Sequence, residues 1–168
     1  MQLIWQDLHH SQLSAAQLYA ILALRCEVFV VEQHCPYQDV DGLDLVGGNR
    51  HVIAWQDGKL LAYLRILENR RILENRSILE NSRILERGDA VGEVAIGRVI
   101  IAPEARGLKL GYTLMEKALL ACDAHWPQAG IVLSAQAHLQ KFYASFGFVT
   151  TSEVYDEDGI PHIDMRRV

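Results

Sequence analysis

The sequence of 168 residues has few cysteines, and those it has form no recognisable set. Cys26, Cys35 and Cys122 are widely separated, and no pair has the spacing of a zinc site or of a disulfide framework. Reduced thiols of this kind are typical of proteins from a reducing compartment. We therefore predict a cytoplasmic protein that holds no metal.

Several other features are missing. No apolar run approaches the roughly 20 residues that cross a bilayer, and the N-terminus lacks the basic-then-apolar pattern of a secretory signal. The formal net charge of -5 disfavours a nucleic-acid partner, because nucleic acids are bound by basic faces. Neither G-x-x-x-x-G-K-[ST] nor a G-x-G-x-x-G after the first predicted strand is present. We therefore expect no nucleic-acid partner and no membrane association. The two missing motifs also exclude these two known types of phosphate-binding loop.

What the sequence does contain is a repeated block. Arg-Ile-Leu-Glu-Asn-Arg returns four times with small edits between residues 65 and 88. A period of six keeps each residue type on one face of a strand, whereas in a helix it makes no continuous apolar stripe. Deleting residues 65–82 leaves a complete α/β pattern, so we interpret the block as an insertion between the third and fourth strands of a single domain, residues 1–168. The alternative is a segment that mediates self-association, for instance in a homodimer.

Hydrophobic periodicity outlines the elements. Apolar residues at helical spacing after Ser14 predict a helix over 15–33. Asp57-Gly58 predicts a tight hairpin turn between strands 50–56 and 59–67. The other expected elements are strands 3–8, 91–103 and 129–136, helices 112–126 and 137–148, and two C-terminal strands around Asp158-Gly159. This order predicts the class α/β (α+β mixed), with helices packed over one sheet.

The loop between strand 91–103 and helix 112–126 is the clearest candidate for a binding site. Gly107 and Gly111 let its backbone bend and approach a ligand. The N–H groups of residues 108–112 are expected to be free at the start of the helix, where the helix dipole favours an anion such as a diphosphate. Arg106 and Lys109 add positive charge beside it.

Two segments together suggest a family. The loop Arg106-Gly107-Leu108-Lys109-Leu110-Gly111 and the stretch FYASFGF at 142–148 resemble the GNAT superfamily of acetyl-CoA-dependent N-acyltransferases. In that family a [QR]-x-x-G-x-[GA] loop after the fourth strand binds the CoA pyrophosphate; here Lys109 replaces the first glycine. Residues 24–44, 135–148 and 153–165 resemble the ElaA-like branch. The resemblance implies a mixed, mostly antiparallel sheet, splayed at the fourth and fifth strands, with helices on both faces.

The resemblance also implies roles for individual residues. Tyr143 matches the family tyrosine that donates a proton to the leaving thiolate, although by spacing alone it would pack between Phe142 and Phe146. The strand before the loop would pair with the pantetheine arm, opposite residues 134–136. The residues expected to bind the cosubstrate are Val99, Ile101, Arg106, Gly107, Leu108, Lys109, Leu110, Gly111, Tyr112 and Gln136.

A proton acceptor is also needed, because an alkylammonium ion cannot attack a thioester. Glu32 and His162 are the predicted residues, with His138 and Glu93 as further candidates and a chain of water molecules as the alternative. Two acidic groups would attract a cationic amine if both border one cleft. They are Asp39, Asp41 and Asp44 beside Glu32, and Glu153, Asp156, Glu157 and Asp158.

The expected activity is transfer of an acetyl group from acetyl-CoA to a primary amine, on a small molecule or a protein, by direct attack in a ternary complex. The alternative is a non-catalytic module of the same fold that binds or senses an acyl-CoA. The intact Tyr143 favours the enzyme, because a sensing module needs no proton donor at the thioester.

Overall fold

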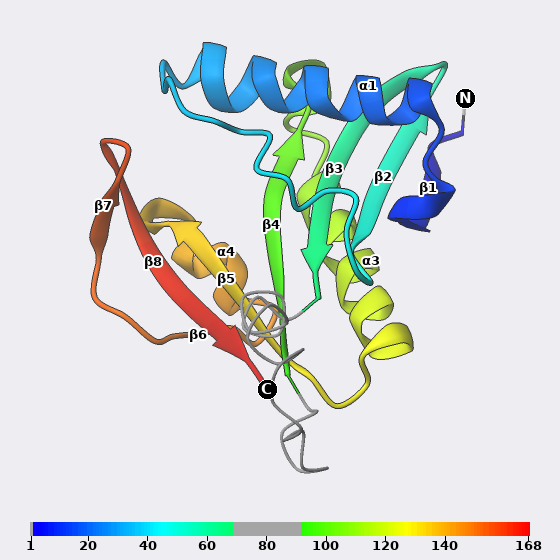
Figure 1. The fold of residues 1–168 in the computed structure, drawn as a ribbon. Coiled ribbons are helices and arrows are strands. Elements are labelled where there is room, and N and C mark those ends of the chain that lie inside the picture. The colour runs from blue at the N-terminus through cyan, green and yellow to red at the C-terminus, as the bar shows by residue number, and fades with distance from the viewer. Residues whose placement is uncertain (1, 69–91) are drawn as a thin grey trace, which may run out of the picture. The chain divides into compact units, whose positions relative to one another are not determined.

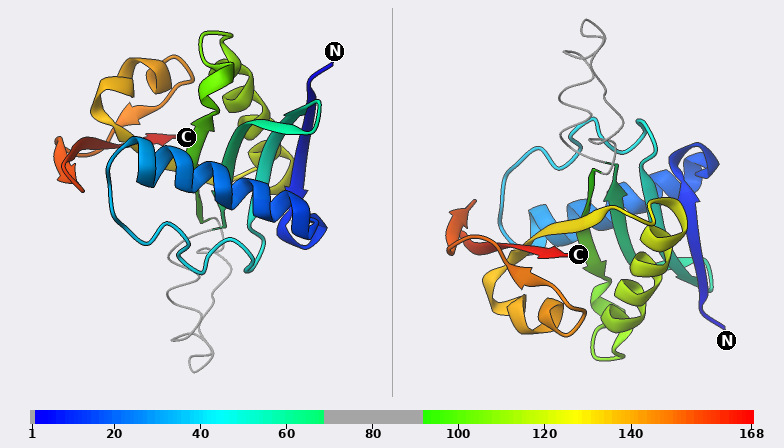
Figure 2. Two further views of the ribbon diagram at one scale, coloured as in Figure 1. Left: turned by 90° about the horizontal axis from the view of Figure 1, so that it is seen from above. Right: turned by 90° about the horizontal axis from the view of Figure 1, so that it is seen from below.

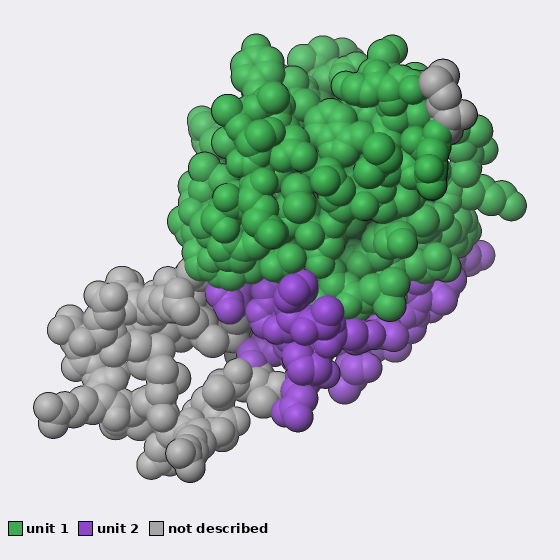
Figure 3. Space-filling view, turned by 90° about the vertical axis from the view of Figure 1, so that its right-hand side faces the viewer, with its two compact units in different colours: residues 1–67, 98–121 green, residues 68–97, 122–168 purple. Residues whose placement is uncertain are grey.

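The computed structural model describes residues 2–68 and 92–168, which form two compact units (Figures 1 and 3). Of the described residues, unit 1 comprises 2–67 and 98–121, and unit 2 comprises 68, 92–97 and 122–168. Strand β4 (Glu93–Ile101) and helix α3 (Leu110–His125) each have residues in both units. The repeated block lies outside the described residues except for its first four residues, so the insertion and the single domain stay predictions.

Unit 1 is built on antiparallel strands. β1 (Ile4–His9) pairs with β2 (Arg50–Gln56), which pairs with β3 (Lys59–Leu67). The turn residues Asp57 and Gly58 have φ angles of 52° and 76°, as a type I′ hairpin requires. The predicted hairpin is therefore confirmed, with both strands at their expected bounds. β4 is the next neighbour of β3 in the sheet.

The first long helix departs from prediction in one respect. After the short 3-10 turn η1 (His10–Gln12), α1 (Ala15–Arg25) begins with a capping box. In it the Gln17 N–H donates to Ser14 Oγ at 3.1 Å, and the Ser14 N–H donates to Gln17 Oε1 at 2.9 Å. From Cys26 to Glu32 the chain continues as a π-helix, η2, instead of an α-helix. π-helical turns are rare and occur often at functional sites.

Helices cover the strands of unit 1 on two sides. α1 lies over one face of β1–β3, and the first part of α3 lies over the opposite face (Figure 2). The apolar residues of α1 and of the strands form a common core, which includes the fully buried Ile21, Ile53 and Tyr63. Hydrophobic burial of these side chains fixes the helix to the sheet.

Unit 2 combines parallel and antiparallel pairing. Residues 93–95 of β4 pair in parallel with residues 130–132 of β5 (Gly130–Gln136), and the ladder ends there. β5 pairs antiparallel with β8 (Ile160–Arg167), which also pairs with β6 (Val149–Thr150) and β7 (Tyr155–Glu157). The short helices η4 (Ala137–Leu139) and α4 (Gln140–Ala144) follow β5.

The predicted fold class is confirmed. The sheet is mostly antiparallel, β4–β5 is the parallel pair among the strands described, and helices flank the strands. Gly147, with φ of 87°, ends the helical segment as predicted, whereas β6 was not predicted. A two-residue strand carries too little periodicity to be recognised in a sequence.

Candidate functional site

The loop before α3 offers a run of unpaired amides. η3 (Pro103–Ala105) begins it, and the amides of Ala105, Arg106 and Tyr112 donate to Ala102, Pro103 and Lys109 carbonyls at 2.9, 3.4 and 3.2 Å. The prediction of a free backbone N–H was therefore wrong for Tyr112. The five amides of residues 107–111 donate to no group in the part of the chain that the structure describes. Successive free N–H groups at a helix N-terminus are suited to bind phosphate oxygens.

Backbone conformation gives this loop its shape. Gly107 has φ of 84° and Lys109 has φ of 58°, so two alternate residues are left-handed. Lys109 occupies the position where the family motif has glycine, and it adopts the conformation that glycine would adopt at low cost. A side chain in this region costs about 1–2 kcal/mol. Lys109 is thus held in a conformation that favours glycine, the residue that the motif has at this position.

Arg106 is already paired. Its guanidinium donates two hydrogen bonds to the Glu32 carboxylate, at 2.6 and 3.0 Å, and a third to the Ile101 carbonyl at 3.3 Å. The hydrogen bonds and the charge of Arg106 lower the pKa of Glu32, against a smaller opposing effect of burial. Glu32 is therefore a weaker proton acceptor in this arrangement than an unpaired glutamate.

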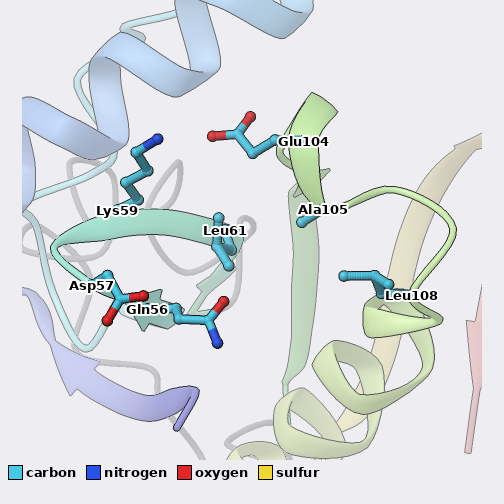
Figure 4. A pocket seen from close by; sticks show the side chains of 7 residues that line it. All are labelled: Gln56, Asp57, Lys59, Leu61, Glu104, Ala105 and Leu108. Atoms are coloured by element: carbon cyan, nitrogen blue, oxygen red, sulfur yellow. The ribbon is translucent and has the colours of Figure 1, made fainter. Parts of the chain in front are cut away.

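A pocket of about 270 Å³ adjoins the same loop within unit 1. The β2–β3 turn and the loop form its walls, and the side chains of Lys59 and Glu104 point toward each other (Figure 4). Leu61, Ala105 and Leu108 supply its apolar surface. Leu108 is a predicted cosubstrate-binding residue, but its side chain points into this pocket. Its backbone amide is therefore the group that could bind the cosubstrate in the loop.

The first predicted acidic group has a different role from the one expected. Asp39 and Asp44 are buried, and both accept hydrogen bonds from the fully buried Arg25, at 2.9 and 2.5 Å. Arg65 donates to Asp44 and to the more exposed Asp41. These carboxylates are neutralised by arginines inside unit 1, so the prediction that they attract an amine was wrong for Asp39 and Asp44.

Arg98 is a residue that the sequence analysis did not single out. It lies in β4 with φ of 54°, and its guanidinium donates to the side chain and the carbonyl of Asp39 at 2.8 and 3.0 Å. Its charge also lies 5.7 Å from the centre of the Tyr37 ring. The sequence feature that could have identified Arg98 is the pair Gly97-Arg98 inside an apolar strand, since a glycine within a strand often marks a bulge or bend. Val99 and Ile101 follow, half-buried, on either side of buried Ile100.

Tyr143 lies in α4 of unit 2, where 5 % of its surface is exposed. Phe142 and Phe148 pack against its ring at 5.0 and 6.3 Å between centroids. Its hydroxyl makes no hydrogen bond with any residue described. Burial raises the pKa of Tyr143 to about 12, so the phenol holds its proton at neutral pH.

One face of β5, β7 and β8 carries polar side chains at paired positions. Ser134 Oγ and the Tyr155 hydroxyl both donate to Asp164 Oδ1, at 2.7 and 2.6 Å. The ring of His162 stacks with Tyr155, with centroids 6.2 Å apart. Its Nδ1 lies 2.8 Å from the Ile160 carbonyl, so Nδ1 carries the proton of the neutral ring and Nε2 is the basic nitrogen.

The other predicted site residues of unit 2 are placed less favourably for binding a substrate or accepting its proton. Glu93 forms an ion pair with Arg166, with Oε1 and Nε 2.9 Å apart, and His138 is exposed in η4. Gln136, half-buried, ends β5 opposite His162. The second acidic group is exposed, and Glu157 lies 3.7 Å from His162. No group able to hold a metal ion, and no helix able to cross a membrane, occurs in residues 2–68 and 92–168.

Comparison with known proteins places this geometry in a family. The sequence profile of the acetyltransferase (GNAT) domain matches residues 17–168. Protein ElaA of Escherichia coli is 54 % identical over 163 residues, which cover 97 % of this chain and 95 % of the relative. Crystal structures of E. coli ElaA and of an acyl-CoA N-acyltransferase from Pseudomonas aeruginosa each match with a TM-score of 0.85 and 51 % identity, over 99 % of this chain and 100 % of theirs.

The chain belongs to the GNAT acetyltransferase family, a class of N-acyltransferase enzymes. Within this family it is similar to ElaA along nearly its whole length. The resemblance inferred from the loop and from FYASFGF is thereby confirmed. The resemblance of residues 24–44, 135–148 and 153–165 to the ElaA-like branch is confirmed as well, because these segments lie within the matched part of the chain.

Proposed function

We propose that this protein transfers an acetyl group from acetyl-CoA to a primary amine. The observation that carries the proposal is the run of five unpaired amides at residues 107–111, at the start of α3. A CoA diphosphate supplies acceptors for these donors, and Lys109 adds a positive charge. Arg106 would contribute if it exchanged its Glu32 partner for a phosphate oxygen.

In the proposed reaction the amine nitrogen attacks the thioester carbonyl carbon, forming a C–N bond and an oxyanion. The oxyanion collapses, the C–S bond breaks, and CoA leaves as a thiolate that takes the proton of the Tyr143 hydroxyl. The buried, unpaired phenol supports this role, because it is protonated and engages no described residue. The proton that the amine loses goes to His162 Nε2 or to water, and the tyrosinate regains a proton from solvent.

Glu32 stays a second candidate for the proton acceptor. It would first have to leave Arg106, since the ion pair lowers its pKa. The binding partners of the proposal are acetyl-CoA and the amine, with no metal, nucleic acid or membrane. The three cysteines, none of which forms a disulfide, support a reducing, cytoplasmic location. We also propose that the protein can form a homodimer, and a measurement of its mass in solution tests this.

The test is thiol release from acetyl-CoA over a panel of primary amines, with Tyr143→Phe beside the wild type. We expect the variant to lose about 100-fold in kcat, the usual size of a general-acid effect. Its affinity for CoA should change less than twofold, because the ring packing is retained. Equal rates for both proteins on every amine, with CoA still bound, would support the alternative of a non-catalytic acyl-CoA sensor.

A further inference from the structure

The polar face of β5, β7 and β8 contains a carboxylate without a cationic partner. Asp164 lies directly opposite Ser134 in the antiparallel register, and Tyr155 reaches it from β7. Both hydroxyls donate to Oδ1. Oδ2 receives no hydrogen bond, and no lysine, arginine or histidine pairs with Asp164, among the residues described. Asp164 is half-buried, so its charge is only partly solvated.

This arrangement fixes the carboxylate in one orientation. The two short hydrogen bonds to Oδ1 hold the group, and Ser152 Oγ accepts from the Asp164 backbone N–H at 2.9 Å. Burial and the bond to Asp164 raise the pKa of Tyr155, which keeps that hydroxyl a donor. A partly desolvated carboxylate is stabilised by a cation that supplies the missing hydrogen bonds. An ammonium group would supply both the missing positive charge and the missing hydrogen bonds of the Asp164 carboxylate.

The bound ammonium is not the nitrogen that reacts. A carboxylate in contact with an amine favours the protonated form, and that form cannot attack a thioester. The candidate proton acceptor on the same face is His162 Nε2, two residues along β8. Two residues of a strand span about 7 Å, a distance comparable to an extended diamine of about four or five carbons.

We propose that Asp164, oriented by Ser134 and Tyr155, binds a second, non-reacting ammonium group of the acceptor. This inference rests on the proposed function and narrows its substrate class to diamines and related amines with two cationic groups. Ser134 and Tyr155 act as positioning residues, since they reach the acceptor through Asp164. The exposed carboxylates of Asp156 and Glu157 in β7, and of Asp158 in the following turn, favour the approach of a dication.

The experiment compares 1,4-diaminobutane with 1-aminobutane, which have the same carbon chain and differ in one cationic group. We expect wild-type kcat/KM to be at least about tenfold higher for the diamine at low ionic strength. Asp164→Asn should bring this ratio close to one, and Ser134→Ala and Tyr155→Phe should lower it to a smaller extent. Asp123→Asn removes the same charge from an exposed position of α3 and should keep the wild-type ratio.

Binding of both amines, measured by calorimetry in the presence of CoA, separates the two proposals. A diamine preference that Asp164→Asn abolishes supports the site, even if no acetyl transfer occurs and the proposed function fails. Acetylation of both amines at the same kcat/KM, or a preference that survives Asp164→Asn, would overturn the diamine site and leave the proposed function intact.

Discussion

The Glu32 carboxylate and the Arg106 guanidinium share two hydrogen bonds, of 2.6 and 3.0 Å, across 74 residues of sequence. The pair joins the end of η2 to the loop before α3, within unit 1. Two residues with separate expected roles, proton acceptor and diphosphate ligand, thus bind each other. Their side chains are 41 % and 45 % exposed, so the pair is sensitive to salt and can be exchanged for other partners.

We predict that Glu32→Gln affects the binding of acetyl-CoA more than it affects catalysis. Loss of the negative charge frees Arg106 for a phosphate, so the Kd for CoA should fall about two- to fivefold at low salt. The change in kcat should stay below about threefold if Glu32 positions Arg106. Calorimetric titration with CoA, together with the pH profile of kcat, measures both effects.

The matched variant is Arg106→Gln, which should weaken CoA binding and reduce its dependence on salt. In the double variant the effect of Glu32→Gln on CoA affinity should disappear, because it acts through Arg106. A 100-fold loss of kcat in Glu32→Gln with unchanged CoA affinity would instead identify Glu32 as the proton acceptor.

Lys109 permits a test of backbone strain. At φ of 58° a glycine avoids the left-handed penalty, so Lys109→Gly should be about 1 kcal/mol more stable than Lys109→Ala. Both variants lose the charge, and both should weaken CoA binding by the same few-fold factor. Thermal unfolding and CoA titration of the two proteins check this. Equal stabilities would mean that the left-handed conformation is not retained at this position.

Asp44 is predicted to be important for stability. Its replacement by asparagine leaves Arg25 and Arg65 with one carboxylate less in a buried network. Removal of one partner from a buried ion pair costs about 3–5 kcal/mol. Thermal unfolding of Asp44→Asn should show a Tm lower by about 6–20 °C. Asp57→Asn makes the same chemical change in the exposed β2–β3 turn and should alter Tm by less than about 2 °C.

The same network predicts how stability responds to acid. Burial alone would raise the pKa of Asp41, but the hydrogen bonds and charge of Arg65 outweigh it and lower the pKa to about 2. A carboxylate whose pKa is lower in the folded state stabilises the fold above its unfolded pKa, about 3.9. This contribution is lost as the pH falls from about 4 to about 2. Urea unfolding at pH 5 and pH 3 should therefore show a smaller loss of stability in Asp41→Asn than in the wild type.

Much of the fold could be predicted from local patterns. The hairpin at residues 50–67 follows from two alternating runs and the turn Asp57-Gly58, because the turn type depends on adjacent residues alone. The α1 start follows from Ser14 and Gln17 for the same reason. The π-helix at Cys26–Glu32 and the pairing of β6 with β8 could not be predicted. Their hydrogen bonds depend on how the chain packs around them, which local propensity does not encode.

The candidate site likewise has features that local sequence predicts and features that depend on tertiary packing. The sequence alone determined that a glycine-containing loop precedes α3 and that a tyrosine lies in FYASFGF, because both are runs of neighbouring residues. Only the tertiary structure decided which polar side chains meet: Glu32 with Arg106, Asp39 with Arg25 and Arg98, and Asp164 with Ser134 and Tyr155. Each of these contacts needs atoms within about 3 Å of each other. Chain folding sets such distances between distant residues, whereas sequence spacing sets them only between neighbours.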